Sequence, residues 1–106
     1  MLYDPKWERT SPIVKDLIAA RHLIEAPESW SSNGGWGSDG RMCAAQAICV
    51  ARGTTFSGGE AQKLLTKAAG VNYIGFFNDT HSHSEILELF DLAIAQARVL
   101  AEKVRD

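Results

Sequence analysis

The sequence predicts an all-α fold, a single compact domain of about four helices packed around a central buried helix. Apolar residues recur at helical spacing in four segments, and residues that cap helices precede them. The segment 40–52 is apolar on nearly every side, so the other helices must surround it. With 106 residues, 45% of them hydrophobic, the chain is long enough for one core. Residues 1–10 are expected to form an N-terminal arm, and residues 11–106 the helical domain.

The first helix is expected from Pro12 to about Ala26. Ser11 can act as the N-cap, and Pro12 suits the first helical position because its missing N–H has no helical partner there. Pro27 ends the run, since proline cannot continue a helix. His22 has no base or ligand partner at helical spacing and is expected on the surface. The stripe that should face the core comprises Ile13, Val14, Leu17, Ile18, Ala20 and Ile24.

A polar, glycine-rich loop is predicted over residues 27–39. It holds Trp30 and Trp36, and an indole in such a loop either folds back over the core or offers a stacking surface to a ligand. Residues 35–40 match the Gly-x-Gly-x-x-Gly pattern, but a helix and a loop precede them where a dinucleotide-binding fold needs a strand. We therefore expect no dinucleotide site, and we expect Asp39 to be the N-cap of the next helix.

The central helix is expected over residues 40–52, with Gly53 in the left-handed position that ends many helices. A Ser-x-x-Glu capping box, Ser57 to Glu60, should begin the third helix, which Gly70 closes.

The segment 71–77 is the most ambiguous part of the chain. It is β-branched and aromatic but interrupted by glycine, so a short extended segment and a single helical turn both fit. No second strand is predicted that could pair with it, which favours irregular or single-turn structure packed into the core. Residues 78–80 are expected to form a turn.

A second capping box, Ser82 to Glu85, begins the longest predicted helix. A thinner second stripe on this helix, Leu87, Leu92 and Val99, could be covered by a partner chain, so a homodimer through this helix is one expected arrangement. The opposite face is expected to be solvated and carries Glu88, Asp91, Gln96, Arg98 and Lys103. The main stripe should face the core over more than five turns and comprises Ile86, Leu89, Phe90, Ala93, Ile94, Ala97, Leu100, Ala101 and Val104.

Composition argues against several classes of function. The net charge is −2, and the 13 acidic and 11 basic residues are interspersed, so no nucleic-acid partner is expected. No segment approaches the ~18 apolar residues of a membrane span, and no secretory signal is expected. Cys43 and Cys49 lie on different faces of one predicted helix and cannot form a disulfide with each other, which favours a reducing, cytoplasmic location. No cofactor is expected.

Two stretches, residues 40–48 (with Met-Cys-Ala-Ala-Gln-Ala) and residues 77–87 (with Asn-Asp-Thr-His-Ser-His-Ser-Glu), carry a family resemblance. Together with the long helix that follows, they resemble an uncharacterised family of small bacterial and phage proteins. In that family a cysteine-containing, alanine-rich helix precedes an Asn-Asp turn and a His-x-Glu helix start. The resemblance covers about residues 11–101. It implies a bacterial or phage setting and no particular activity.

By residue, the resemblance places Cys43 on the family's cysteine and His83 on its histidine. Asn78 and Asp79 fall on its Asn-Asp pair. The chain departs from the family at Ser82, where threonine or a small residue is commoner, and lacks the glycine often seen in the central helix.

Cys43, His83 and Asp79 are the candidate catalytic residues. Cys43 lies near the start of the central helix, where the dipole can lower the pKa of a thiol. The fold could bring it to His83 and to an orienting group at Asn78 or Asp79, the composition of a papain-like cysteine hydrolase or transferase. The alternative to catalysis is that these residues have structural roles only. Cys43 would then be a small core residue, Asn78 and Asp79 would satisfy turn and cap donors, and His83 would pack locally. The signature tripeptides of known cysteine enzymes are absent.

The candidate ligand-binding residues lie near two predicted helix starts, where backbone N–H groups can hold an anion. Asp79, His81 and His83 also suggest a metal, but no further ligand stands at a fixed spacing, so no metal site is expected. The ligand-binding candidates are Trp36, Asp39, Asn78, Asp79, His81 and His83.

The expected function is that of a small non-enzymatic binding or interaction protein of bacterial or phage origin. It would sequester a small anionic or nucleotide ligand, or a protein partner. The alternative is a cysteine-dependent hydrolase or transferase that uses Cys43 and His83.

Overall fold

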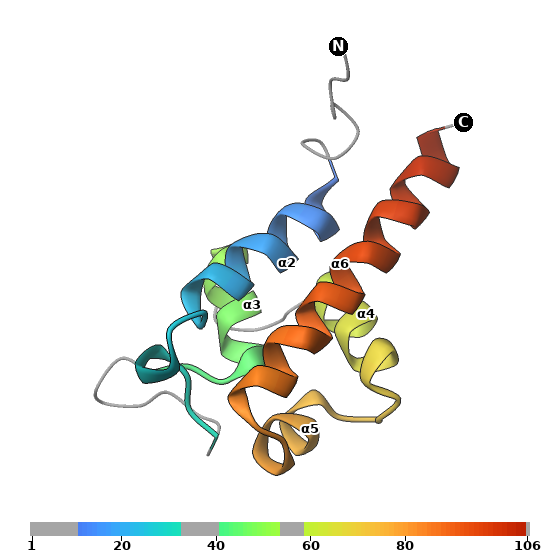
Figure 1. The fold of residues 1–106 in the computed structure, drawn as a ribbon. Coiled ribbons are helices and arrows are strands. Elements are labelled where there is room, and N and C mark those ends of the chain that lie inside the picture. The colour runs from blue at the N-terminus through green and yellow to red at the C-terminus, as the bar shows by residue number, and fades with distance from the viewer. Residues whose placement is uncertain (1–10, 33–40, 54–58, 106) are drawn as a thin grey trace.

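The computed structural model describes residues 11–32, 41–53 and 59–105, with the backbone alone for residues 104 and 105. This part of the chain forms five α-helices and one turn of 3₁₀-helix, and it contains no sheet (Figure 1). The predicted all-α globule is therefore confirmed. The elements are α2 (Pro12–Leu23), η1 (Pro27–Ser29), α3 (Ala44–Arg52), α4 (Gly59–Ala69), α5 (Ile74–Thr80) and α6 (His83–Arg105).

The helix α2 begins as predicted but ends earlier. The Ser11 hydroxyl accepts a hydrogen bond from the backbone N–H three residues later at 3.4 Å, and Pro12 occupies the first turn. The last helical residue is Leu23, not Ala26. Ala26 adopts extended backbone with ψ of 135°, as expected for a residue that precedes proline, so the helix cannot include it.

The central helix α3 is shorter than predicted, because it begins at Ala44 rather than at Gly40. Its N-cap is Cys43, so the prediction that Asp39 caps this helix is wrong; Asp39 itself lies outside the described residues. The backbone around Met42 pairs with the segment that follows η1, and this pairing delays the first helical turn.

The end of α3 and its packing against other helices are as predicted from the sequence. Gly53 follows the helix with φ of 79°, the left-handed conformation predicted for it. The helix packs against α2, α4 and α5. It buries Ala44, Ala47 and Ile48, and the small alanine side chains allow the close approach of its neighbours. Cys49 is half-buried.

The helix α4 ends at Gly70 as predicted, with φ of 72°, whereas its expected cap Ser57 lies outside the described residues. The helix α5 agrees with the helical alternative for the segment 71–77 but is longer than the single turn expected, since it has seven residues, Ile74–Thr80. Residues 78–80, which were expected to form a separate turn, belong to this helix. The buried residues of α5 are Ile74 and Asn78, which the i, i+4 spacing places on one face. Burial of that face outweighs the β-propensity of the segment.

The helix α6 begins at the predicted capping box. The Ser82 N–H donates to Glu85 Oε1 at 2.8 Å, and the Glu85 N–H donates to Ser82 Oγ at 3.2 Å. The main apolar stripe of α6 is buried over fewer turns than predicted, since Leu100 is 46% exposed. The reason is length: α6 has 23 residues, whereas α2 and α4, which pack against it, have 12 and 11.

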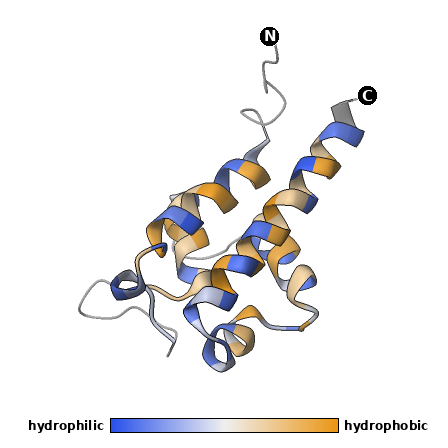
Figure 2. Ribbon diagram, in the orientation of Figure 1, coloured by the Kyte–Doolittle hydropathy of each residue, from blue (hydrophilic) through white to orange (hydrophobic). Residues whose placement is uncertain are grey.

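One core joins residues from all five α-helices. Apolar and polar residues alternate along the ribbons of α2 and α6, as expected for helices with one buried face (Figure 2). Among the described helices, none has both the length and the apolar composition needed to cross a membrane. The largest fully buried side chains are Phe90, Leu17, Ile24, Ile48, Leu65, Ile74, Ile86, Val14 and Asn78.

Candidate functional site

A short backbone pairing next to the start of α3 organises the region that the sequence analysis singled out. Trp30 and Met42 form an isolated parallel bridge. The Ser31 N–H donates to the Met42 carbonyl at 2.9 Å, and the Met42 N–H donates to the Ser29 carbonyl at 3.0 Å. The two chain segments that flank residues 33–40 are therefore held together beside α3.

The buried amide of Asn78 is the centre of this region. Its Oδ1 accepts hydrogen bonds from the indole N–H of Trp30 at 2.8 Å and from the backbone N–H of Ala44 at 2.9 Å. Its Nδ2 donates to the carbonyl of Ser31 at 2.9 Å and to the carboxylate of Asp79 at 3.4 Å. A carboxamide offers two acceptor and two donor positions, and all four are used here. Asn78 therefore joins α5, α3 and the segment after η1.

Cys43 lies at the N-cap of α3 and is only 5% exposed. Its backbone N–H donates to the side chain of Gln46 at 3.4 Å. Within the described part of the chain, no hydrogen bond joins Cys43 to His83. Burial raises the pKa of the other thiol, Cys49, despite the opposing charge of Arg52.

His83 lies in the first turn of α6 and contacts the chain that follows α2. Its Nε2 is 2.7 Å from the carbonyl oxygen of Ile24, which can only accept, so Nε2 carries the hydrogen. The imidazole also packs against the indole of Trp30, with ring centroids 5.4 Å apart and an interplanar angle of 43°. These contacts link the start of α6 to the end of α2.

His81 and Asp79 lie at the end of α5. The His81 ring stacks on Phe77 with centroids 3.6 Å apart, and its Nδ1 is 2.9 Å from the Phe77 carbonyl and 3.0 Å from the hydroxyl of Thr80. Asp79 is exposed and accepts from Asn78. Among the described residues, no group of three His, Cys, Asp or Glu side chains is placed to hold a metal ion.

Two of the ligand-binding candidates, Trp36 and Asp39, lie outside the described residues. Of the others, Asn78 and His83 meet in one cluster through Trp30, and His81 lies at the far end of α5 on Phe77. Asn78 uses all four polar positions of its amide, and the Nε2 of His83 and the Nδ1 of His81 each lie within hydrogen-bond distance of a backbone carbonyl.

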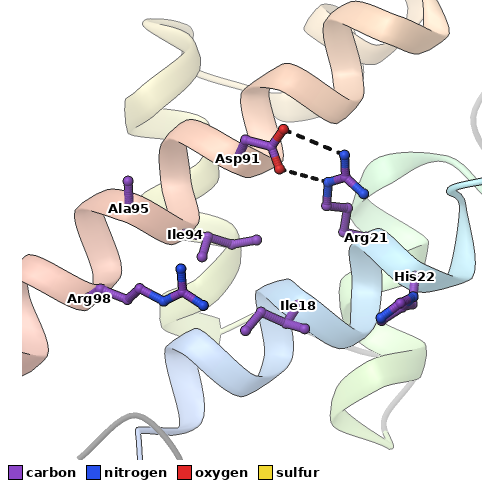
Figure 3. A pocket seen from close by; sticks show the side chains of 7 residues that line it. All are labelled: Ile18, Arg21, His22, Asp91, Ile94, Ala95 and Arg98. Atoms are coloured by element: carbon purple, nitrogen blue, oxygen red, sulfur yellow. Dashed lines mark hydrogen bonds and ion pairs between the residues drawn. The ribbon is translucent and has the colours of Figure 1, made fainter. Parts of the chain in front are cut away.

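A second candidate site is a pocket of about 400 Å³ between α2 and α6. Figure 3 shows Arg21 and Arg98 on either side of it, with Ile18 and Ile94 between them. The described residues that line it are Ile18, Arg21, His22, Asp91, Ile94, Ala95 and Arg98.

Arg21 is the residue that connects the two walls of the pocket. Its Nε lies 2.8 Å from Asp91 Oδ1, and its Nη2 lies 3.5 Å from Asp91 Oδ2 (Figure 3). Its Nη1 lies 3.4 Å from Glu25 Oε2, and the other carboxylate oxygen of Glu25 lies 3.3 Å from the Nδ1 of His22. The Arg21 guanidinium is thus held in a fixed orientation at the edge of the pocket.

This pocket was not predicted from the sequence. His22, Asp91 and Arg98 were expected on solvated surfaces, which is correct for each residue alone, since all three are exposed. The missing information was the register of α2 against α6, which brings Arg21 beside Asp91 across 70 residues of sequence.

A family model described as a family of unknown function, DUF6197, matches residues 8–96. Searches of curated proteins and of solved structures found no match to the chain. The matched range contains both the Asn78 cluster and the residues of the pocket up to Ala95.

Proposed function

The chain belongs to DUF6197, and we propose that it is a non-enzymatic binding protein whose ligand is a small anionic molecule held in the pocket between α2 and α6. The observation that carries this proposal is the position of Arg21 and Arg98 on either side of an apolar floor. Guanidinium groups are the side chains best suited to recognise carboxylate or phosphate, because their N–H groups form a planar fork.

The charge of the lining favours a ligand with a single negative charge. Arg21 and Arg98 contribute two positive charges, and Asp91 contributes one negative charge. Glu25 also contacts Arg21, which further reduces the positive potential at that end. A monocarboxylate therefore matches the pocket better than a nucleotide with several phosphate charges.

The floor of the pocket favours a ligand with a short apolar body. Ile18, Ile94 and Ala95 line it, and among the described residues no Trp, Tyr or Phe does. Aliphatic side chains stabilise an aliphatic ligand through burial of apolar surface, whereas a nucleobase gains most from stacking on an aromatic ring. A volume of about 400 Å³ lies within the range of small-molecule sites.

The contacts of the predicted catalytic residues support binding over the cysteine-hydrolase alternative. Cys43 is buried, His83 donates to a backbone carbonyl, and Asn78 has no unused polar position. An activated thiol needs a base within hydrogen-bond reach. We also propose a bacterial or phage origin and a cytoplasmic location, which rest on the family resemblance and on the two free cysteines.

Isothermal calorimetry with hexanoate tests the proposal, with inorganic phosphate, AMP and hexanol as comparison ligands. We expect hexanoate to bind with a Kd of about 0.1–1 mM, and hexanol to bind much more weakly because it lacks the charge. Arg98→Gln should weaken hexanoate binding by about tenfold or more, since a charge-assisted hydrogen bond is lost. Lys67→Gln, which removes an exposed positive charge from α4, is the matched control.

Asp91→Asn gives a test in the opposite direction. It removes the internal carboxylate that holds Arg21, so hexanoate should bind about two- to fivefold more tightly. Glu88→Gln, one turn earlier on α6 and outside the pocket, should leave the affinity unchanged. Absence of hexanoate binding at millimolar concentration, or binding that Arg98→Gln leaves intact, would overturn the proposal.

A further inference from the structure

The solvent-facing side of α6 carries apolar side chains that the fold leaves uncovered. Leu92 is 47% exposed and Val99 is 51% exposed, although both lie in the middle of a 23-residue helix. Glu88 precedes them by one turn and Lys103 follows by one turn, and both are exposed. We call this surface the outer face of α6: Glu88, Leu92, Ala95, Gln96, Val99 and Lys103.

We propose that the outer face of α6 binds a second copy of this chain, with the two α6 helices antiparallel across a two-fold axis near Ala95 and Gln96. The helical repeat places all six residues within an arc of about 100°, on the side away from the buried stripe. A continuous row at this spacing is the pattern by which two helices pack along their length.

The order of residues along the outer face is self-complementary. When an identical helix is laid antiparallel with its centre between Ala95 and Gln96, each Leu92 lies opposite the partner's Val99. In the same register each Glu88 lies opposite the partner's Lys103. A two-fold interface must be complementary to itself, and this face meets that condition in both its apolar centre and its charged ends.

The charges also select the antiparallel arrangement. A parallel pair in register would place Glu88 opposite the partner's Glu88 and Lys103 opposite the partner's Lys103, which is repulsive at both ends. Within the described part of the chain, neither side chain forms an ion pair that would compete with these contacts. The small side chain of Ala95 near the axis permits close approach of the two helices.

The outer face of α6 is separate from the charged groups of the pocket. Asp91, Ile94 and Arg98 lie on a neighbouring side of α6, toward α2, and Ala95 alone belongs to both surfaces. Variants at Glu88, Leu92 and Lys103 can therefore test association without altering the arginines of the pocket.

Sedimentation equilibrium of the full chain over a concentration series measures the association. We expect a monomer–dimer equilibrium, and we expect Lys103→Glu to raise the dimer Kd by about tenfold, since both symmetry-related charge pairs become repulsive. Glu88→Lys should have a similar effect. The double variant with Glu88→Lys and Lys103→Glu should restore the original Kd to within about twofold, because it exchanges the charges in the antiparallel register.

Leu92→Asp tests the apolar centre of the outer face. It should abolish the dimer over the same concentration range, because it places a carboxylate in each apolar contact. Val50→Asp is the matched control: Val50 is 38% exposed on α3, outside the outer face, and its substitution should leave the Kd unchanged. Circular dichroism establishes that each variant is folded.

A wild-type chain that stays monomeric up to about 0.5 mM would overturn the proposal. A dimer that survives Leu92→Asp would place the interface elsewhere and would also overturn it. A dimer that the double charge exchange fails to restore would contradict the antiparallel register.

Discussion

Replacement of Asn78 by alanine removes the amide on which the junction of α3, α5 and the segment after η1 depends. The substitution leaves the Ala44 N–H and the Trp30 indole N–H without their acceptor, and the Ser31 carbonyl without its donor. The side chain is fully buried, so its four hydrogen bonds are not readily replaced by bulk water.

The expected magnitude follows from the groups left unsatisfied. An unpaired buried donor costs about 1–3 kcal/mol, and the partly buried Trp30 indole belongs at the low end of this range because water can reach it. For Asn78→Ala we therefore expect a loss of about 2–4 kcal/mol in the free energy of unfolding. A domain of this size has a total of about 5–15 kcal/mol, so the variant should fold, with a Tm lower by about 8–20 °C.

Urea denaturation followed by circular dichroism measures this loss. Asp79→Asn is the matched control, because Asp79 is exposed and makes one long hydrogen bond, so its substitution should change the stability by less than about 0.5 kcal/mol. Amide hydrogen exchange supplies a local readout, since the Ala44 N–H should exchange faster in Asn78→Ala. A loss below about 0.5 kcal/mol for Asn78→Ala would refute the assignment of Asn78 as a structural centre.

Three further predictions concern the caps and the thiols. The hydrogen bonds from the backbone and side chain of Ser82 hold the pKa of Glu85 below its usual 4.5. The Glu85 carboxylate therefore stabilises the fold fully above pH 4.5, and this stabilisation is lost as the pH falls through the lower pKa of the folded state. The stability difference between the wild type and Glu85→Gln in urea should therefore shrink on acidification, and a constant difference from pH 7 to pH 3 would contradict the capping geometry. Gly53→Ala should lower the free energy of unfolding by about 1 kcal/mol, as measured by thermal or urea denaturation, because φ of 79° is strained for alanine. The added Cβ would meet no atom within 4 Å, so a steric clash does not contribute. An unchanged stability would argue against the left-handed cap. Cys43 and Cys49 should both react with iodoacetamide more slowly than a free thiol at neutral pH, the first because it is 5% exposed and the second because burial raises its pKa. Alkylation of Cys43 at or above the free-thiol rate would revive the hydrolase interpretation.

The features that could be predicted from the sequence are those set by local chemistry. The N-cap at Ser11, the capping box at Ser82 and Glu85, and the left-handed residues Gly53 and Gly70 depend only on neighbours within a few residues. The apolar stripes were sufficient to predict an all-α core for the same reason, since helical spacing alone defines them.

The features that could not be predicted depend on contacts distant in sequence. The segment that contains Ile74 and Asn78 has β-propensity by composition, and it forms a helix because that geometry buries both side chains on one face. The start of α3 is delayed by the pairing of Met42 with residues near Trp30. Asn78 was singled out from the sequence, but its partners lie 34 to 48 residues away, so a structural role could not be separated from a ligand-binding role.

An NMR titration of the full chain with hexanoate distinguishes the pocket from the Asn78 cluster in one experiment. We expect chemical-shift changes at the methyl groups of Ile18 and Ile94 and at the Nε–H of Arg98, and none at the Trp30 indole N–H or the Asn78 side-chain amide. Shifts concentrated at Trp30 and Asn78, with the pocket resonances unmoved, would contradict binding in the pocket.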